Sequence, residues 1–503
     1  MKTPHVALFQ TPNRTYMFDV NKDRLITISE ESYCFLSKVL DGSFGADSAD
    51  YSADMPDELA RLREAGYLSA ESSVREIRHY YSDYLGQLLS RKLSKITLQL
   101  TQDCNLRCTY CVYTENEDSL QRTHSRKKMT WETVEKSIDF LWSRSVDSQF
   151  INVGFYGGEP LLEFSLIKRT IAHCNEKFRG KNTTYNITTN GTLLTDEMIR
   201  YFIEHNVSVM ISLDGPKEIN DRNRVFVDGS GTFDAVMERI RRIKQTFPAL
   251  AEKLHISVVL DTENDYDCVN EFYVSLDDLD FSVSYIDNDH KSAESYSYSE
   301  DYIAKSVYHR FLSLLAQFGR VPKSEFSVSA NASIERVVSE HRLVGRGASL
   351  HAVDSPSGPC IPGQLRLFVT ADGNFIPCER VNETSPAMNI GNLDDGFYLE
   401  NALRILNFGK ISEGECVKCW CFRYCELCAK KADVKERDLS AERKLLSCSG
   451  VRSNVYEKFR SYLLFKEIPT FYRGSVLCAE SDETVSARAA GGAGFSQEEG
   501  ERW

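Results

Sequence analysis

Short apolar runs separated by polar turns fill the first 75 residues. The segments VALFQ, TYMFDV and RLITIS are rich in β-branched and aromatic residues, a composition typical of strands. Two amphipathic helical patterns follow, EESYCFLSKVL and PDELARLREAGYL, and Pro56 suits the first turn of the second. Residues 1–75 are therefore predicted to form a small winged-helix-like unit, followed by a charged helical linker over residues 76–94.

From residue 95 onward, strand patterns alternate with amphipathic helices. The strand patterns are SKITLQLT, FINVGFYGGEP, YNITTNG, VSVMISLDG and LHISVVL. Helical patterns separate them, such as TWETVEKSIDFLWSR, for which Thr130 is a suitable N-cap. This alternation predicts an α/β fold with a parallel sheet, and we expect a partial (β/α)6 barrel over residues 95–320. Functional side chains of such a barrel lie on the loops that follow its strands.

The rest of the chain has weaker periodicity. Residues 321–349 are expected to form a bridging helical region, and residues 350–455 a cysteine-rich domain whose loops are held by metal clusters. Residues 456–503 begin with a helical pattern and end in AAGGAGFSQEEGERW, a polar tail that is expected to be disordered.

Composition and charge narrow the possible partners and the compartment. A formal net charge of −13 makes the chain a poor general binder of nucleic acid. No apolar run approaches the roughly 20 residues that span a bilayer, and the N-terminus lacks the apolar segment of a signal peptide. We therefore expect a cytoplasmic protein that acts neither on nucleic acid nor at a membrane. In that compartment, clustering among the 15 cysteines favours metal or redox chemistry over disulfides.

Three cysteines follow the first barrel strand with the spacing C-x3-C-x2-C: Cys104, Cys108 and Cys111. Three thiolates in one tight loop can hold three irons of a [4Fe–4S] cluster and leave the fourth iron open. An open iron suits S-adenosylmethionine (SAM), because one electron from the cluster can then break a C–S bond and release a 5′-deoxyadenosyl radical. Zinc is disfavoured, since tetrahedral zinc needs a fourth ligand and none lies nearby.

This motif and its surroundings resemble the radical SAM superfamily over about residues 95–290. The run Gly157-Gly158-Glu159-Pro160, after the second barrel strand, is similar to the family's GGEP motif, whose backbone approaches the SAM amino group while the Glu adds a carboxylate or braces the loop. The resemblance implies an aromatic residue near the adenine, an Asn near the ribose, and a Ser with an Arg at the SAM carboxylate, for which Arg222 competes with Arg224. The SAM-site residues predicted in this way are Tyr110, Gly157, Gly158, Glu159, Pro160, Thr188, Asn190, Ser212, Asp214 and Arg224.

A second cysteine pattern resembles the SPASM extension of radical SAM enzymes, which carries two auxiliary [4Fe–4S] clusters. The implied ligands are Cys416, Cys419, Cys425 and Cys448 for the outer cluster, and Cys360, Cys378 and Cys428 for the inner one.

The pattern departs from the family at two points. Only two residues separate Cys425 from Cys428, and Cys421 is an additional cysteine. The inner cluster has three matched ligands, so it keeps an open iron for a substrate thiolate unless Cys421 fills it. A zinc site on the four cysteines between residues 416 and 428 that have C-x2-C spacing is the alternative. That site leaves the other cysteines of the pattern unexplained.

The resemblance also implies a substrate class. SPASM enzymes largely modify peptides and proteins, and the N-terminal unit resembles the element that binds the leader of a ribosomal precursor peptide. The cysteine-rich run 416–428 most resembles maturases that form thioether crosslinks. An electron donor such as flavodoxin or ferredoxin is then a second partner. Glu379, next to Cys378, resembles a general base of sulfatase-maturing relatives, or pairs with Arg380.

Other functions remain open at this point. The enzyme alternatives are a maturase that forms carbon–carbon crosslinks or epimers, and one that oxidises a sulfatase cysteine to formylglycine. Outside enzymes, the alternative is an iron–sulfur redox sensor or electron-transfer protein. The GGEP motif speaks against a sensor, since a sensor needs no SAM pocket.

Overall fold

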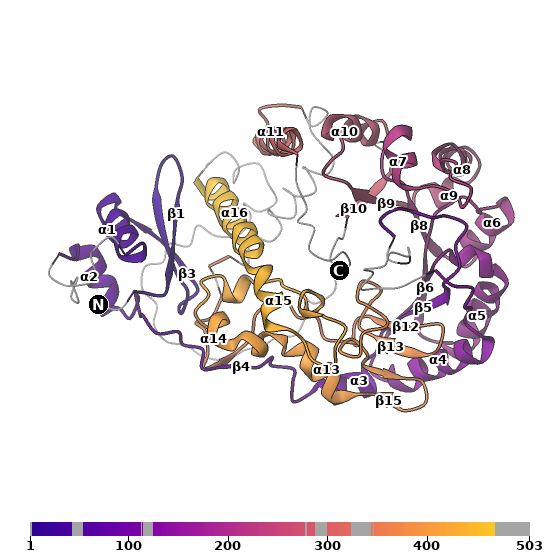
Figure 1. The fold of residues 1–503 in the computed structure, drawn as a ribbon, viewed down its shortest axis with the longest axis horizontal. Coiled ribbons are helices and arrows are strands. Elements are labelled where there is room, and N and C mark those ends of the chain that lie inside the picture. Colours follow the sequence, from indigo (N-terminus) through magenta and orange to yellow (C-terminus); the bar gives the residue numbers. More distant parts are fainter. Residues whose placement is uncertain are drawn as a thin grey trace.

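The computed structural model (Figure 1) describes residues 3–42, 54–111, 113, 124–276, 279–286, 299–322, 344–345 and 347–467. Its first unit is a three-stranded antiparallel sheet with two helices. The elements are β1 (Val6–Gln10), β2 (Thr15–Asp19), β3 (Arg24–Ile28), α1 (Glu30–Leu40) and α2 (Asp57–Glu64), and the strand order is β1-β2-β3. All five predicted elements are present, although Pro56 is the N-cap of α2 and does not lie in its first turn.

The linker after this unit is helical only in its second half. Residues Glu76–Ile77 form β4, which pairs in parallel with β11 (Val353–Asp354), and α3 (Leu85–Arg91) follows. The prediction of a wholly helical linker is therefore wrong at its start. Two residues carry too little periodicity to reveal a strand whose partner lies almost 280 positions away.

Six parallel strands form the partial barrel, and neighbours in sequence are neighbours in the sheet. The strands are β5 (Lys95–Thr101), β6 (Phe150–Gly157), β7 (Asn182–Thr189), β8 (Val207–Ser212), β9 (Leu254–Leu260) and β10 (Asp280–Tyr285). The helices that follow them are α4 (Trp131–Arg144), α5 (Phe164–Lys177), α6 (Asp196–Glu204), α7 (Lys217–Asn223), α8 (Phe233–Thr246), α9 (Pro248–Ala251), α10 (Tyr266–Val274) and α11 (Glu300–Gln317). This confirms the predicted α/β partial barrel. Strand β10 escaped prediction because it lies at the sheet edge, where most of its residues are exposed and polar.

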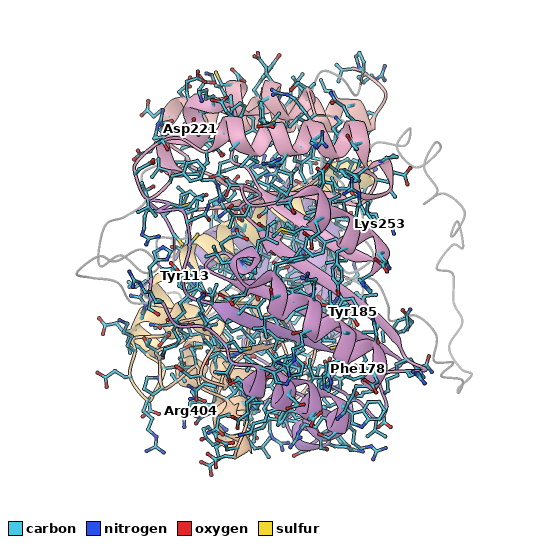
Figure 2. The ribbon with its side chains drawn as sticks, turned by 90° about the vertical axis from the view of Figure 1, so that its right-hand side faces the viewer. Tyr113, Phe178, Tyr185, Asp221, Lys253 and Arg404 are labelled. Atoms are coloured by element: carbon cyan, nitrogen blue, oxygen red, sulfur yellow. The ribbon has the colours of Figure 1, made fainter. Side chains whose placement is uncertain are left out.

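The two faces of the barrel sheet differ in chemistry. Outward side chains such as Leu98, Val153 and Ile187 join one apolar core with the covering helices, whose outer surface Figure 2 shows face-on. On the inner face, a Cβ at Gly154 would lie between Thr97 and Asn186 of the neighbouring strands. The interior of the partial barrel is therefore lined by polar side chains on these strands.

The C-terminal region extends the same sheet to ten strands. Strand β12 (Leu367–Val369) pairs in parallel with β5, and β13 (Asn374–Ile376), β14 (Gly391–Asn392) and β15 (Gly396–Phe397) follow as antiparallel neighbours. Its helical elements are α13 (Leu399–Leu406), α14 (Glu413–Cys416), α15 (Ala441–Leu446), α16 (Cys448–Glu467) and several 3-10 turns. The last helix begins at Cys448, eight residues before the predicted boundary. Most of residues 321–349, and the tail from 468, lie outside the described residues.

The N-terminal unit packs on this C-terminal region. The Phe9 ring of β1 stacks on Tyr456 and Phe459 of α16, with ring centroids 4.9 and 5.1 Å apart, and Figure 1 shows α16 beside β1. Phe18 and the buried Cys421 belong to the same apolar cluster. One face of the three-stranded sheet packs on α1 and α2, and the other face packs on α16 and the cysteine-rich segment. None of the described helices is long and apolar enough to cross a membrane.

Candidate active site

The first cysteine loop leaves the carboxyl end of β5. The Cys104 sulfur accepts a hydrogen bond from the Leu106 backbone N–H at 3.4 Å, and the Cys111 sulfur accepts one from the Tyr113 N–H at 3.5 Å. Burial raises the pKa of the Cys104 and Cys108 thiols to about 12, and the neighbouring cysteines of the loop add to both shifts. Three neighbouring cysteines, two of whose sulfurs accept backbone N–H donors, in a pocket that disfavours bare thiolates, fit a metal cluster that neutralises them.

The GGEP turn lies against the start of this loop. Gly157 has φ +141° and a Cβ there would lie 2.2 Å from the Thr101 carbonyl oxygen. A Cβ at Gly158 would lie 2.1 Å from the Asp103 carbonyl oxygen. Backbone hydrogen bonds close the contact, from Gly158 to Thr101 at 2.8 Å and from Glu159 to Asp103 at 2.9 Å. Only glycine fits at both positions, so the motif sets the position of the cysteine loop.

Glu159 braces the turn from within. Its carboxylate is fully buried and accepts hydrogen bonds from the Leu161 N–H, the Thr189 hydroxyl and the Asn190 N–H at 2.8–2.9 Å. Burial raises the pKa of Glu159 to about 7, while these three donors oppose the shift. Of the two roles that the sequence left open for Glu159, the geometry favours bracing. Pro160 is buried beside it and begins a short 3-10 turn, Pro160–Glu163.

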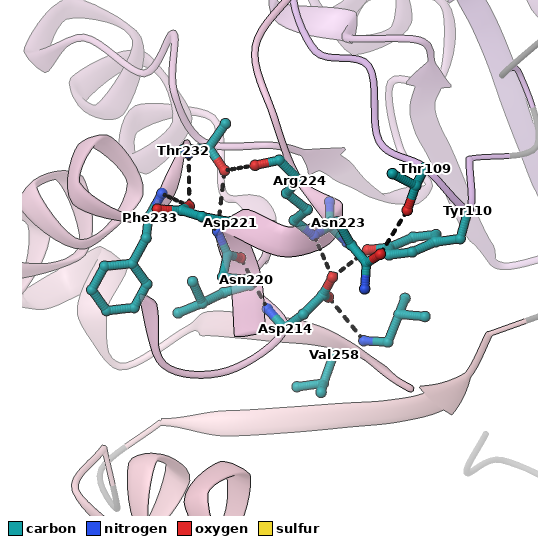
Figure 3. Close-up of polar contacts among 12 residues, drawn as sticks. Thr109, Tyr110, Asp214, Asn220, Asp221, Asn223, Arg224, Thr232, Phe233 and Val258 are labelled. Carbon is teal, nitrogen blue, oxygen red and sulfur yellow. Dashed lines mark hydrogen bonds and ion pairs between the residues drawn. The ribbon is translucent and has the colours of Figure 1, made fainter. Parts of the chain in front are cut away.

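A buried ion pair occupies the end of β8 (Figure 3). Arg224 donates from Nε to Asp214 at 2.9 Å, and both side chains are almost fully buried. The Tyr110 hydroxyl donates to the same carboxylate, the Val259 N–H does so at 3.0 Å, and the Arg224 guanidinium lies 5.5 Å from the Tyr110 ring centre. Arg224, predicted to receive the SAM carboxylate, thus already has a carboxylate partner within the chain. Its competitor Arg222 hydrogen bonds to Asn264.

Other predicted SAM-site residues lie on the neighbouring strand ends. The Asn190 side chain donates to Asn105 at 2.9 Å and reaches the Cys104 sulfur at 3.9 Å, so it contacts the cysteine loop directly. Thr188 is on β7, and its hydroxyl lies 3.9 Å from the Met210 sulfur of β8. Ser212 is the last residue of β8 and is half-buried.

A second polar network connects the cysteine loop to the C-terminal extension. Glu383 accepts hydrogen bonds from the side-chain amides of Gln99 at 2.6 Å and Gln102 at 2.7 Å. Gln99 also donates to the hydroxyl of buried Tyr113 at 3.0 Å. Sequence reasoning missed this group. The polar residues Thr97 and Gln99 at alternate positions of β5 were a usable signal, since they mark an inner face that is not apolar.

The inner auxiliary cysteines lie together. Burial raises the pKa of Cys378 to about 12, and the charges of Glu379, Cys428 and Cys360 act on it as well. Partial burial of the sulfur raises the pKa of Cys360, and the charge of Cys428 raises it further, although the Cys360 residue as a whole keeps access to solvent. Cys360 and Cys428 are exposed. The structure therefore brings together the three residues assigned to the inner cluster, which come from three separate segments.

The outer cysteines form a separate group. Cys425 is electrostatically coupled to Cys419 and Cys416, and Cys448 to the same two residues. The extra residue Cys421 belongs here: its sulfur lies 3.5 Å from that of Cys419. It thus sits with the outer group and not as the fourth member of the inner one. Within the described residues, no three His, Cys, Asp or Glu side chains are arranged to hold a single metal ion.

Glu379 lies closer to Arg366 than to Arg380, the partner predicted from the sequence. Its carboxylate is 3.2 Å from the Arg366 guanidinium and 4.0 Å from that of Arg380. Arg366 directly precedes β12, so the pair closes the base of the β12–β13 hairpin.

Comparison with known proteins decides the family of the barrel. The model of the radical SAM superfamily matches residues 98–272, which span β5 to α10. These residues form a radical SAM domain. The domain implies a [4Fe–4S] cluster and SAM, for which the cysteine loop and the GGEP turn supply fitting residues. This confirms the predicted radical SAM domain in this part of the chain.

Curated proteins similar to this chain include maturases. It is 27% identical over 358 residues to a cysteine-type anaerobic sulfatase-maturating enzyme of Clostridium perfringens, covering 68% of this chain and 90% of the relative. It is 36% identical over 137 residues to an uncharacterized protein of Methanocaldococcus jannaschii, covering 27% of this chain and 44% of that protein. The radical SAM cyclopropyl synthase TigE of Paramaledivibacter caminithermalis is 25% identical over 224 residues, which cover 42% of this chain and 47% of that enzyme.

Solved structures share the fold. The structure of native anSMEcpe with bound AdoMet aligns with a TM-score of 0.54 and 20% identity, covering 74% of this chain and 100% of the other. The alignment supports the α/β radical SAM architecture with a C-terminal extension.

Proposed function

We propose that this radical SAM enzyme matures a cysteine-containing precursor peptide by joining a cysteine sulfur to a carbon of another residue. One observation carries the proposal: Cys360, Cys378 and Cys428 lie together, and two of them are exposed. A [4Fe–4S] cluster on three cysteines leaves one position for a further ligand. A substrate thiolate is the soft ligand that fits this position.

The radical SAM domain contributes the hydrogen abstraction. When bound, its cluster and SAM supply a radical that takes a hydrogen atom from an unactivated carbon. Cys104, Cys108 and Cys111 would hold that cluster, with the Leu106 and Tyr113 N–H groups on two sulfurs. The glycine contact keeps the GGEP turn close to this loop, and the buried Asp214 accepts a hydrogen bond from the Tyr110 hydroxyl.

In this proposal, the N-terminal unit binds the leader of the precursor peptide. Its sheet has two edge strands, β1 and β3, and an extended leader can add to such an edge by main-chain hydrogen bonds. One face of this sheet packs on α16, so the N-terminal unit lies next to the cysteine-rich region. A bound leader would therefore hold the rest of the peptide at high local concentration near that region. A flavodoxin or ferredoxin would supply the electron.

The product tests the proposal. The reconstituted enzyme is incubated with SAM, a reductant and a cysteine-containing peptide encoded beside its gene. We expect a product lighter by two hydrogens per bridge, whose bridged cysteine no longer reacts with an alkylating agent. A product whose cysteines all still alkylate contradicts the thioether and favours a carbon–carbon crosslink.

A second candidate is oxidation of a cysteine to formylglycine. The name of the Clostridium perfringens relative, aligned over 90% of its length, favours it, as does the carboxylate of Glu379 beside Cys378. The two products are easily separated. Formylglycine is an aldehyde and reacts with a hydrazide probe, whereas a thioether does not.

A further inference from the structure

A buried lysine points at the outer cysteine group. Lys444, on α15, is only 2% exposed. Its ammonium lies 2.7 Å from the Ser412 hydroxyl, 3.2 Å from the Cys416 sulfur and 3.4 Å from the Gly409 carbonyl oxygen. The Phe408 ring centre lies 4.9 Å away and closes the remaining side.

This ammonium needs a negative partner. Burying a lysine is costly unless an anion compensates it, and a hydroxyl or a carbonyl offers only a partial charge. Among the hydrogen-bond partners of Lys444 in the described part of the chain, the Cys416 sulfur is the one atom that can carry a full negative charge. The lysine therefore fits a Cys416 thiolate and, through it, the net negative charge of a thiolate-ligated cluster.

The outer cysteine group has a second cation nearby, whereas the inner group has a carboxylate beside one of its cysteines. A hydrogen bond with Cys421 and, less strongly, the nearby Arg452 of α16 lower the pKa of the Cys419 thiol. The inner group instead has the carboxylate of Glu379 next to Cys378, with Arg366 as a partly exposed counter-charge. The outer group therefore has a buried cation directly on a cysteine sulfur, whereas the carboxylate beside the inner group is paired with arginines.

We infer that Lys444 raises the reduction potential of the outer auxiliary cluster. Reduction adds one negative charge to a cluster, and a buried cation at a ligand sulfur stabilises that charge. The inference rests on the proposed auxiliary clusters. Lys444 acts as a positioning residue, because it touches a ligand and not the substrate.

The test is a redox titration followed by electron paramagnetic resonance. Replacing Cys104, Cys108 and Cys111 with Ala first removes the radical SAM cluster, so that only auxiliary signals remain. In this background we expect Lys444→Met to lower the reduced-to-oxidised ratio of one auxiliary cluster about tenfold at fixed potential, or ~59 mV for a one-electron couple. Lys444→Arg keeps the charge and should restore the potential.

Matched variants separate the possible failures. Lys136→Met removes an exposed lysine of α4 that pairs with Glu132 and Asp394, on segments that carry no cysteine, and should leave both potentials unchanged. Unchanged potentials in Lys444→Met with full iron content would overturn the inference. So would loss of the outer cluster in both Lys444→Met and Lys444→Gln, which would mark a purely structural role. A parent protein with no auxiliary iron would instead refute the clusters themselves.

Discussion

At the scale of single residues, Gly158 determines whether the cysteine loop can lie against the GGEP turn. Gly158→Ala would place a Cβ 2.1 Å from the Asp103 carbonyl oxygen, a backbone atom that cannot rotate away. We expect the loop to shift at a cost of about 1–3 kcal/mol, with at least a tenfold loss of SAM affinity measured by equilibrium dialysis. Gly414→Ala is the control, because no atom lies within 4 Å of its Cβ position. Equal SAM affinity in the two variants would contradict the close contact.

Glu159 should make stability depend on pH. The carboxyl ionises near its ordinary pKa of 4.5 in the unfolded chain and near 7 in the folded chain. Between these values the folded chain keeps a proton that the unfolded chain has lost, so stability falls as pH rises. The contribution is complete below about pH 4.5 and is lost above about pH 7, on the order of 1–3 kcal/mol.

Urea unfolding at several pH values measures this effect. Glu159→Gln stays neutral throughout, so its free energy of unfolding should vary less between pH 5 and pH 7.5 than that of the parent, by on the order of 1–3 kcal/mol. Parallel pH profiles for the two proteins would show that burial does not hold the proton on Glu159.

At the scale of elements, β1 and α16 depend on each other although they stand at opposite ends of the chain. Phe9 is fully buried between Tyr456, Phe459 and Trp420. Phe9→Ala should cost about 3–5 kcal/mol and increase the rate of limited proteolysis within the N-terminal unit. Tyr84→Ala is the control, since that ring is 58% exposed. Equal proteolysis of the two variants would mean that the N-terminal sheet does not need this contact.

This contact also affects how leader binding should be tested. Deleting residues 1–75 would remove Phe9 and Phe18 and expose the apolar side chains of α16 and of the Cys416–Cys425 segment. Such a deletion changes the cysteine-rich region as well as the leader site. Single substitutions on the edge strands β1 or β3 therefore isolate leader recognition more cleanly.

At the scale of the whole molecule, the three cysteine groups predict the iron content. Three clusters require roughly 12 irons per anaerobically reconstituted chain, four for each. Replacing Cys104, Cys108 and Cys111 with Ala should leave about eight irons and abolish SAM cleavage, measured by iron analysis and chromatography. Bound zinc together with only four irons would instead support the zinc alternative for the second cysteine pattern.

Much of the fold could be predicted because it depends on local repetition. The alternation of strands and helices after residue 95 follows from apolar periods that each element carries by itself. The spacing of Cys104, Cys108 and Cys111 and the GGEP run are similarly local, since one turn of chain must present several ligands at once. The matched radical SAM residues, 98–272, lie within this part of the chain.

Contacts between distant segments could not be read from the sequence. Glu383 reaches Gln99 across 284 positions, and β4 pairs with β11, yet neither partner shows any local pattern of its own. The burial of Lys444 could not be predicted either, because the sequence around it is mostly polar and is typical of an exposed segment.

The sequence by itself determined the barrel, the cysteine loop and the GGEP turn, because each depends on residues that are close together in the chain. Only the tertiary structure decided that Cys421 lies with the outer group, that Arg224 is paired with Asp214, and that Phe9 is enclosed by α16. The physical reason is that these positions follow from how apolar faces pack and how buried charges find partners. These contacts form between separate elements, so the periodic pattern of apolar residues within any one element does not reveal them.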